Sequence, residues 1–471
     1  MQTTSANQKA SFSTDITVLS PSSPPVPLSQ TTINALSPYA TPSPGLFPII
    51  VLGNPKNHPT NIPQVTLEAL KECGVTLSAP IIYYPGIPSN TPAYIEQYLT
   101  LSTEVGLKQL IRWNDYDPSK VDLATQKQMW YNLSSRLGSN DTVGGWMLCK
   151  DTSNSLLREL SSLKSSVSDI WQRIVYISMG TSKEYTGSTS SSSPFEWFGD
   201  YQTYVRNMAS QFHTAVWTNA FYAFHSELSS SSIRSDYFQN LEMFRRLAYA
   251  TTRPWWGVAK AGYAPLTTTS GSSKLDSESV AIIKHRCNYE AHMMLAFGAQ
   301  GIVWHDFFDT KSTSTSPFYS PIDTTAQINK DIYNIIKEIN TEIEALSDIF
   351  LGGSVREVRF SKTSSKYTGF QIGLTTPMGA LTSLSSQAEE FNRGCVMSRI
   401  LNKGFEHIVI INTDASVIQS VTVRFSTPVS QVRPLRSPIT SGQITSTTLS
   451  LKPGEWAIFS LQLFEDVDLS D

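Results

Sequence analysis

The sequence is poor in charged residues and contains no long apolar run. Only 16% of its 471 residues are charged, and 36 basic side chains nearly balance 39 acidic ones, for a formal net charge of −3. This balance leaves no positive excess for a polyanion, so we expect no nucleic-acid partner. No stretch approaches the ~20 apolar residues that a membrane-spanning helix needs, so we also expect no membrane span.

Cysteine is scarce as well. The four cysteines lie far apart, at Cys73, Cys149, Cys287 and Cys395. The sequence contains no CxxC pair and neither an HxH nor an HExxH pattern. This excludes a disulfide-rich scaffold and a zinc ribbon, and it predicts neither a metal site nor a cofactor.

The first residues differ in composition from the rest. Residues 1–43 are rich in Ser, Thr and Pro, and we expect a disordered tether because they offer little apolar surface to bury. They contain no apolar segment typical of a secretory signal peptide. Abundant Ser and Thr with few Lys and Glu favour an extracytoplasmic location (secreted, periplasmic or surface), and a cytoplasmic one stays open.

From residue 44 onward, short apolar runs alternate with helical patterns. The runs that we interpret as strands are Leu46–Leu52, Leu77–Tyr84, Lys108–Trp113, Val143–Leu148, Arg173–Ser178, Ala215–Phe224, Trp255–Ala259 and Gly301–Trp304. Near-continuous apolar strands separated by helices indicate a parallel sheet covered on both faces. We therefore predict a (β/α)8 TIM barrel over residues 44–350. An open doubly wound sheet is the alternative, but its glycine-rich phosphate-binding turn is missing.

The pattern changes after a long predicted helix, Ala326–Ile349. Its apolar residues recur every three or four positions, and we expect it to close the barrel beside a second domain. Residues 351–466 then alternate apolar and polar side chains in runs separated by Gly, Pro, Asn or Asp. This period of two predicts an all-β antiparallel sandwich domain.

Several stretches resemble glycoside hydrolases of the β-galactosidase-like clan. RCNYEAHMMLAFGAQGI (Arg286–Ile302) is similar to the helix that leads into their eighth strand. YFQNLEMFR (Tyr237–Arg245) and RPWWGVAKAGY (Arg253–Tyr263) are similar to the helix and strand before it, and SRILNKGFEHIVIINTD (Ser398–Asp414) to a pair of sandwich strands. The resemblance covers residues 46–465. It implies a carbohydrate-active barrel that binds an oligo- or polysaccharide at the C-terminal ends of its strands.

The catalytic positions of that clan are degenerate in this sequence. Glycoside hydrolysis normally uses two carboxylates, which on a barrel stand at the C-terminal ends of strands. Thr152, directly after Asp151, occupies the place of the clan's acid/base Glu, Asn219 occupies a further acidic position, and the seventh strand carries no carboxylate. We therefore expect impaired hydrolysis.

Two carboxylates are candidates for a displaced catalytic role. Asp151 follows the fourth predicted strand, and Asp306 follows His305 at the end of the eighth, between aromatic residues. The alternative for each is a structural salt bridge or a helix cap.

Aromatic residues near the predicted strand ends are a stronger indication of ligand binding. Aromatic planes stack on the C–H faces of sugars while polar neighbours bind the hydroxyl groups. The candidate substrate-binding residues are Trp113, Trp146, Asn219, Tyr222, Trp255, Trp256, Trp304 and His305. Some of these must fill the core instead, and of the adjacent pair Trp255 and Trp256 one ring must face the barrel interior and the other the helices.

Three functions fit these features. The first is a glycoside-hydrolase-like barrel protein that binds a saccharide with impaired catalysis. The second is a non-catalytic glycan-binding protein, and the third is a structural or assembly protein that makes its contacts through the sandwich.

Overall fold

The protein is described by a computed structural model, which covers residues 47–53, 64–79, 91–112, 123–152, 174–179, 216–219, 222–228, 232–234, 236–251, 254–264, 275–312, 317–362, 370–386, 394–414, 416–432 and 443–463. For residues 91–95, 112, 123, 126–127, 129–130, 133, 148–152, 174–179, 216–219 and 250–251 only the backbone is described. The predicted tether, residues 1–43, lies outside the described residues. The domain boundaries after residues 43 and 350 stay a prediction.

Parallel strands form a closed barrel, as predicted. They are β1 (Ile49–Leu52), β2 (Leu77–Ala79), β3 (Lys108–Arg112), β4 (Val143–Thr152), β5 (Ile174–Met179), β6 (Val216–Asn219), β7 (Trp255–Lys260) and β8 (Ile302–His305). Each strand pairs in parallel with the next, and β8 pairs with β1, where Val303 is the register partner of Ile50. All C-terminal strand ends therefore lie on one face of the barrel, which we call the mouth.

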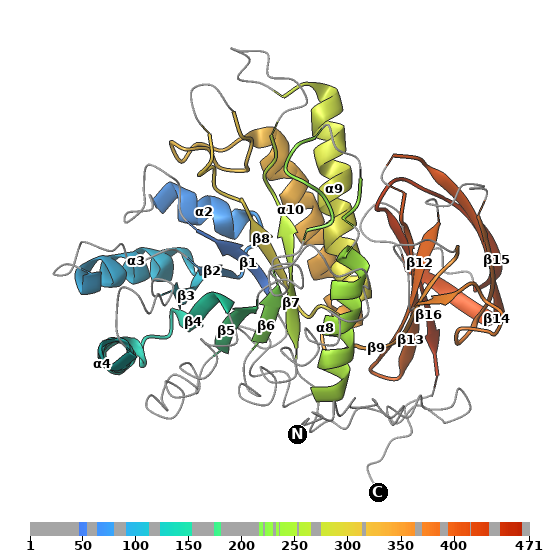
Figure 1. Cartoon of the computed structure of the whole chain (residues 1–471), viewed down its shortest axis with the longest axis horizontal. Coiled ribbons are helices and arrows are strands. Elements are labelled where there is room, and N and C mark those ends of the chain that lie inside the picture. Colours follow the sequence, from blue (N-terminus) through green and yellow to red (C-terminus); the bar gives the residue numbers. More distant parts are fainter. Residues whose placement is uncertain are drawn as a thin grey trace, which may run out of the picture.

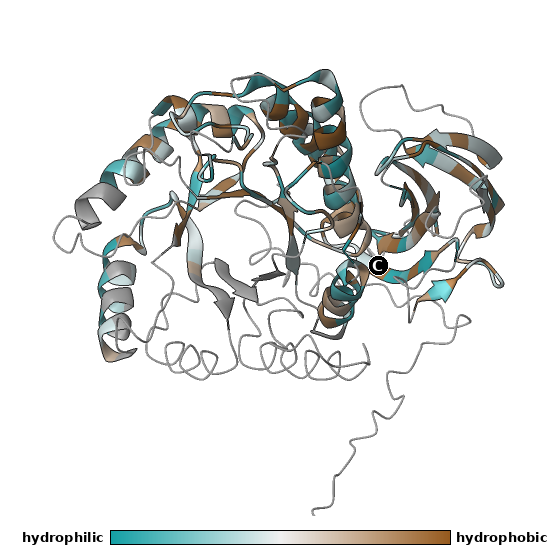
Figure 2. Cartoon of the chain, turned by 45° about the horizontal axis from the view of Figure 1, so that its top comes forward, coloured by the Kyte–Doolittle hydropathy of each residue, from teal (hydrophilic) through white to brown (hydrophobic). Residues whose placement is uncertain are grey.

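The helices that the structure describes lie on the outer side of the barrel (Figures 1 and 2). They are α2 (Gln64–Glu72), α3 (Thr91–Val105), α4 (Leu123–Leu137), α8 (Tyr237–Thr251), α9 (Ser277–Ala296) and α10 (Lys330–Ala345). The long helix α9 begins after Asp276, whose carboxylate accepts a hydrogen bond from the backbone N–H of Ser279 (2.6 Å). The described helices include none long and apolar enough to cross a lipid bilayer.

The two faces of the barrel strands pack into two separate cores. One fills the barrel interior and consists of Ile50, Leu77, Ala79, Leu110, Met147, Trp256, Val258 and Val303. The other lies between the barrel and its helices and contains Trp255, whose ring centre is 5.4 Å from that of Phe244 in α8. The opposite orientation expected for Trp255 and Trp256 is therefore confirmed.

The predicted helix Ala326–Ile349 begins later than expected. The preceding residues form a turn around the Asp323 carboxylate, and Ala326 has a φ of 66°, which does not continue into a helix. α10 therefore starts at Lys330, and its isoleucine stripe is buried as predicted, whereas Ile328, which the predicted helix included, precedes α10 and is 40% exposed. A short helix, α11 (Ser347–Phe350), completes the segment.

The C-terminal part forms a β-sandwich. Its strands are β9 (Ser354–Phe360), β10 (Gln371–Ile372), β11 (Leu381–Ser386), β12 (Cys395–Asn402), β13 (Phe405–Asn412), β14 (Gln419–Val432), β15 (Ile444–Leu451) and β16 (Trp456–Gln462). One sheet has the order β10-β9-β12-β13-β16 and ends on the last residues of β14. The first residues of β14 pair with β11 and β15 in the facing sheet. Apolar side chains between the two sheets form their own core.

The sandwich differs from the prediction in two details. β10 pairs with β9 in parallel, whereas the other described sandwich pairs are antiparallel. β11 was not predicted, because Leu381 and Leu384 are three residues apart and break the period of two. A register shift between Leu381 and Ser383 lets both leucines contact the sandwich core.

The inner sheet of the sandwich packs against the helices on one side of the barrel (Figure 1). The imidazole of His292 in α9 stacks on the indole of Trp456 in β16, with ring centres 3.8 Å apart. Phe350 of α11 lies parallel to the same indole at 5.3 Å. The indole Nε1 donates a hydrogen bond to Glu342 of α10 (2.6 Å). The barrel and the sandwich therefore share one continuous core.

Candidate functional site

Four side chains gather at the mouth where β6, β7 and β8 end. Tyr222 follows β6, Lys260 ends β7, and His305, its register partner, ends β8. The Lys260 Nζ lies 4.6 Å from the centre of the Tyr222 ring, and the Tyr222 and His305 ring centres are 5.6 Å apart. Asp306 follows directly. We call Tyr222, Lys260, His305 and Asp306 the mouth cluster.

Asp306 combines an unusual backbone conformation with two basic partners. Its φ of 60° lies in the left-handed region, which Asp tolerates better than most residues. Its Oδ2 is 2.6 Å from the Nζ of Lys311, and its Oδ1 is 3.1 Å from the Nδ1 of His305. Burial raises the pKa of the Asp306 carboxyl, but His305 and Lys311 outweigh burial and lower this pKa to about 2. The group is therefore ionised at neutral pH and is a poor proton donor.

Lys260 is a buried ammonium without a carboxylate partner in the described part of the chain. Its side chain faces the barrel interior, on the same side of β7 as Trp256 and Val258, and the residue is 5% exposed. Its Nζ donates a hydrogen bond to the hydroxyl of Ser226 (2.9 Å). Burial lowers the pKa of Lys260, while the charges of Glu290 and Asp306 act to raise it.

Glu290 lies behind the mouth cluster, fully buried on α9. Its Oε1 accepts hydrogen bonds from the backbone N–H groups of Ala223 (2.8 Å) and Phe224 (3.3 Å). Its Oε2 accepts one from the backbone N–H of Lys260 (2.7 Å). Burial raises the pKa of Glu290 to about 7, although Lys260 and the backbone donors act to lower it. Glu290 thus fixes the segment after β6 and the end of β7 to α9.

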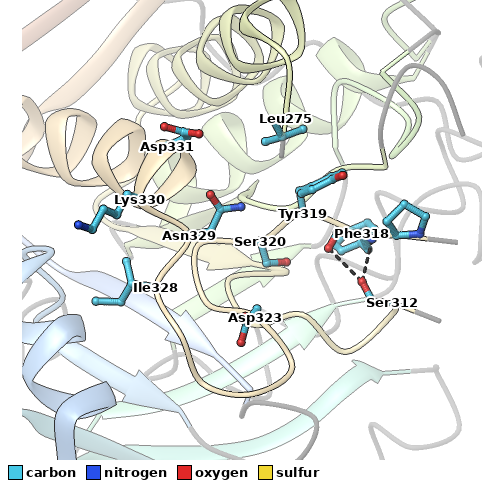
Figure 3. A pocket seen from close by; sticks show the side chains of 11 residues that line it. Leu275, Ser312, Phe318, Tyr319, Ser320, Asp323, Ile328, Asn329, Lys330 and Asp331 are labelled. Carbon is cyan, nitrogen blue, oxygen red and sulfur yellow. Dashed lines mark hydrogen bonds between the residues drawn. The ribbon is translucent and has the colours of Figure 1, made fainter. Parts of the chain in front are cut away.

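A cavity of about 530 Å³ opens beside the mouth cluster, between the segment after β8 and the first turn of α10 (Figure 3). Phe318 and Tyr319 supply its aromatic surface, and Ser320 and Asn329 are among its polar groups. It adjoins the mouth cluster because the Nζ of Lys311, the partner of Asp306, lies 4.8 Å from the centre of the Phe318 ring. Its volume is within the range of ligand pockets, ~300–1,000 Å³.

Four of the predicted binding residues are part of the two cores. Trp146, Trp255 and Trp304 lie in the layer between barrel and helices, with 0–1% exposure. The Trp304 Nε1 donates a hydrogen bond to Asn340 of α10 (2.7 Å), which fixes the ring in that layer. Trp256 lies in the barrel interior and is fully buried. None of these four indoles offers a surface on which a sugar could stack.

The other predicted residues divide into two groups. Tyr222, His305 and Asp306 come together in the mouth cluster. Trp113 lies outside the described residues, and for Asn219 and Asp151 the structure describes the backbone alone. β4 continues through Asp151 to Thr152 with register shifts along its last residues. Because such bulges interrupt side-chain alternation, spacing along β4 does not tell which way Asp151 faces.

Two residues of this region were missed in the sequence. Lys260 stands four residues after Trp256, and the alternation of β7 places both on the same side, which could have indicated a side chain at the mouth. Glu290 is an isolated acid within the apolar run YEAHMMLAF, and such an acid calls for a buried partner. Among the described residues, no group of three or more His, Cys, Asp or Glu side chains is arranged to hold a metal ion.

Comparison with protein-family models and with curated proteins found no match. Among solved structures, the chain is similar to a GH27 β-L-arabinopyranosidase variant from Geobacillus stearothermophilus in complex with arabinose, with 10% identity, a TM-score of 0.46, and 92% of this chain and 99% of that chain covered. It is also similar to a noncanonic maltogenic α-amylase from Thermotoga neapolitana, with 12% identity, a TM-score of 0.47, and 88% and 97% covered. A third is the endo-β-1,4-mannanase from Thermotoga petrophila, with 12% identity, a TM-score of 0.39, and 86% and 97% covered.

At these identities the likeness concerns the fold alone, and the fold itself is established by the strand pairing described above. The chain is a (β/α)8-barrel protein with a C-terminal β-sandwich.

Proposed function

We propose that the protein binds an oligo- or polysaccharide at the barrel mouth and has little or no glycosidase activity. The observation that carries this proposal is the mouth cluster itself. A lysine stands at the end of β7, and the neighbouring buried carboxylate, Asp306, is already paired with Lys311 and His305. These groups suit the binding of a polar ligand better than acid–base catalysis.

Binding is supported by the surfaces available at the mouth. Tyr222 and His305 are half-buried at the strand ends. The adjoining cavity is lined by Tyr319, Asn329 and Asp331, so an aromatic ring and hydrogen-bonding groups lie around the same space (Figure 3). A sugar ring needs this combination, because its C–H face packs on an aromatic ring while its hydroxyl groups take hydrogen bonds.

Weak hydrolysis is supported by the protonation state of Asp306, because Glu290, whose pKa is about 7, is fully buried and binds backbone N–H groups. A general acid works best when its pKa is near the working pH, and it contributes ~10²–10⁴-fold to the rate. Asp306, with a pKa of about 2, carries no proton to donate at neutral pH. Lys260 at the end of β7 cannot act as a carboxylate nucleophile. Saccharide binding in an extracytoplasmic setting completes the proposal.

A binding assay with matched tyrosine variants tests the proposal. We expect a glycan panel measured by calorimetry to reveal at least one saccharide that binds. Tyr222→Ala and Tyr319→Ala should each weaken its binding about fivefold, from the ~1 kcal/mol of an aromatic contact. Tyr131→Ala is the control, because Tyr131 is a 54% exposed tyrosine on α4. If neither Tyr222→Ala nor Tyr319→Ala changes the affinity, binding at the mouth and its adjoining cavity is contradicted.

A hydrolase that uses displaced carboxylates is the second candidate. It is favoured by the position of Asp306 at the end of β8, where an ionised carboxylate can act as nucleophile. Product analysis on the same glycan panel separates the two candidates. We expect negligible turnover. Robust turnover that Asp306→Asn or Asp151→Asn abolishes would establish a hydrolase. A structural protein acting through its sandwich would bind no member of the panel.

A further inference from the structure

Among the described residues of the mouth, Lys260 carries a buried charge that is not paired with a carboxylate. An ammonium group has three donors, and among the described residues its hydrogen-bond partner is one neutral hydroxyl, that of Ser226. A buried charge without a counter-ion is costly, and proteins normally pair it. The lowered pKa of Lys260 agrees with this environment.

The nearby carboxylates that the structure describes do not fill this role. Asp306 is engaged on one oxygen by Lys311 and on the other by His305. Glu290 binds the backbone N–H of Lys260 rather than its ammonium group, and it also holds two further backbone donors. Glu227, another acid near Lys260, is exposed. Among the described residues, therefore, no carboxylate pairs with the Lys260 ammonium group.

We propose that the saccharide recognised at the mouth is anionic, and that its carboxylate or sulfate group pairs with Lys260. The inference rests on the proposed saccharide binding and names the class of sugar. The half-buried Tyr222 ring, next to the Lys260 Nζ, contacts the sugar ring that carries the anionic group. The pairing of Asp306 with Lys311 reduces the repulsion that an incoming anion meets.

A single local cation is compatible with the overall charge of −3. A chain with this charge lacks the broad basic surface that attracts a polyanion over long distances. A buried ammonium instead recognises one anionic group at short range, where a charge-assisted hydrogen bond is stronger than a neutral one. We therefore expect a preference for one acidic sugar residue within the ligand and only modest dependence on salt.

The test compares three oligosaccharides of equal length by calorimetry with the full chain. The first contains uronic acids, the second is the same compound with its carboxylates reduced to alcohols, and the third carries sulfate esters. We expect the uronate or the sulfated compound to bind about 10- to 100-fold more tightly than the reduced one, as a charged hydrogen bond provides. Comparison of the two anionic compounds identifies the source of the charge.

Lysine variants test whether Lys260 causes the preference for the anionic compounds. Lys260→Met should remove the preference, so that this variant binds the anionic and the reduced compounds with equal affinity, whereas Lys260→Arg should keep the preference. Lys71→Met is the control, because Lys71 is exposed at the end of α2. Equal affinity for the uronate, the sulfated and the reduced compounds overturns the inference and leaves saccharide binding standing. An anionic preference that survives in Lys260→Met also overturns it. If none of the three binds, and the wider glycan panel yields no ligand, the proposed function itself fails.

Discussion

At the scale of single residues, Asp306 shows how backbone and charge define one position. Its φ of 60° is accessible to Asp and Asn at little cost, but ~1–2 kcal/mol less favourable for residues such as Ala. Its carboxylate is held by Lys311 at 2.6 Å. Comparison of Asn and Ala variants therefore separates the contribution of the charge from that of the backbone.

We expect Asp306→Asn to lower the free energy of unfolding by roughly 2–3 kcal/mol at pH 7, since the pKa falls from 3.8 to about 2 on folding. Asp306→Ala should cost more because it adds backbone strain. A carboxyl group whose pKa is lowered in the folded state stabilises the fold at pH values above its unfolded pKa. This stabilisation is lost as the pH falls through its folded pKa. In urea unfolding between pH 6 and 3, the difference in free energy of unfolding between the wild type and Asp306→Asn should therefore become smaller below pH 3.8. A difference in free energy of unfolding that does not change with pH would contradict the ion pair of Asp306 with Lys311.

The orientations and partners of single side chains were the features least predictable from the sequence. The hydrophobic pattern located the strands but did not tell whether an indole within a strand faces the mouth or the helices. Trp304 is an example, since its partner Asn340 lies 36 residues away on α10. The pairing of Lys260 with Ser226 likewise depends on how the end of β7 lies against the segment after β6. Long-range partners of this kind leave no local pattern in one sequence.

At the scale of elements, α9 organises the mouth from behind. Glu290 joins this helix to the segment after β6 and to the last residue of β7. The strand runs and the sandwich alternation were predictable, because burial of one or both faces imposes a period on the sequence. The start of α10 was not, because the turn around Asp323 depends on side-chain capping inside an otherwise helical pattern.

Glu290 should make the stability of the barrel depend on pH. Its pKa rises from 4.5 to about 7 on folding because of burial. A group with a raised pKa stabilises below its unfolded pKa, and this contribution is lost as the pH rises through the folded pKa. As the pH rises from 4.5 to 7.5, the free energy of unfolding of the wild type should therefore fall by roughly 3 kcal/mol relative to that of Glu290→Gln, because the glutamine side chain does not titrate. If the free energies of unfolding of the two proteins change with pH in the same way across this range, Glu290 stays ionised when buried.

At the scale of the whole molecule, the barrel and the sandwich are joined through Trp456. Its indole contacts α9, α10 and α11 at once, by stacking on His292 and Phe350 and by its hydrogen bond to Glu342. Burial lowers the pKa of His292, whose Nδ1 lies 2.8 Å from the carbonyl oxygen of Gly454. The interface is therefore built for a neutral imidazole, and acid should weaken it as the pH falls below 6.5.

We expect the wild type to unfold in one calorimetric transition, because the core is continuous across this interface. Trp456→Ala should lower stability by about 3–5 kcal/mol, the usual cost of removing a buried tryptophan, and should leave Glu342 without its donor. Since the lost contacts lie between the two parts, the variant should show two separated transitions, whereas Ile418→Ala, at a 56% exposed position of the sandwich, should leave one. Two transitions already present in the wild type would mean that the barrel and the sandwich unfold independently, and that the indole fills space without coupling them.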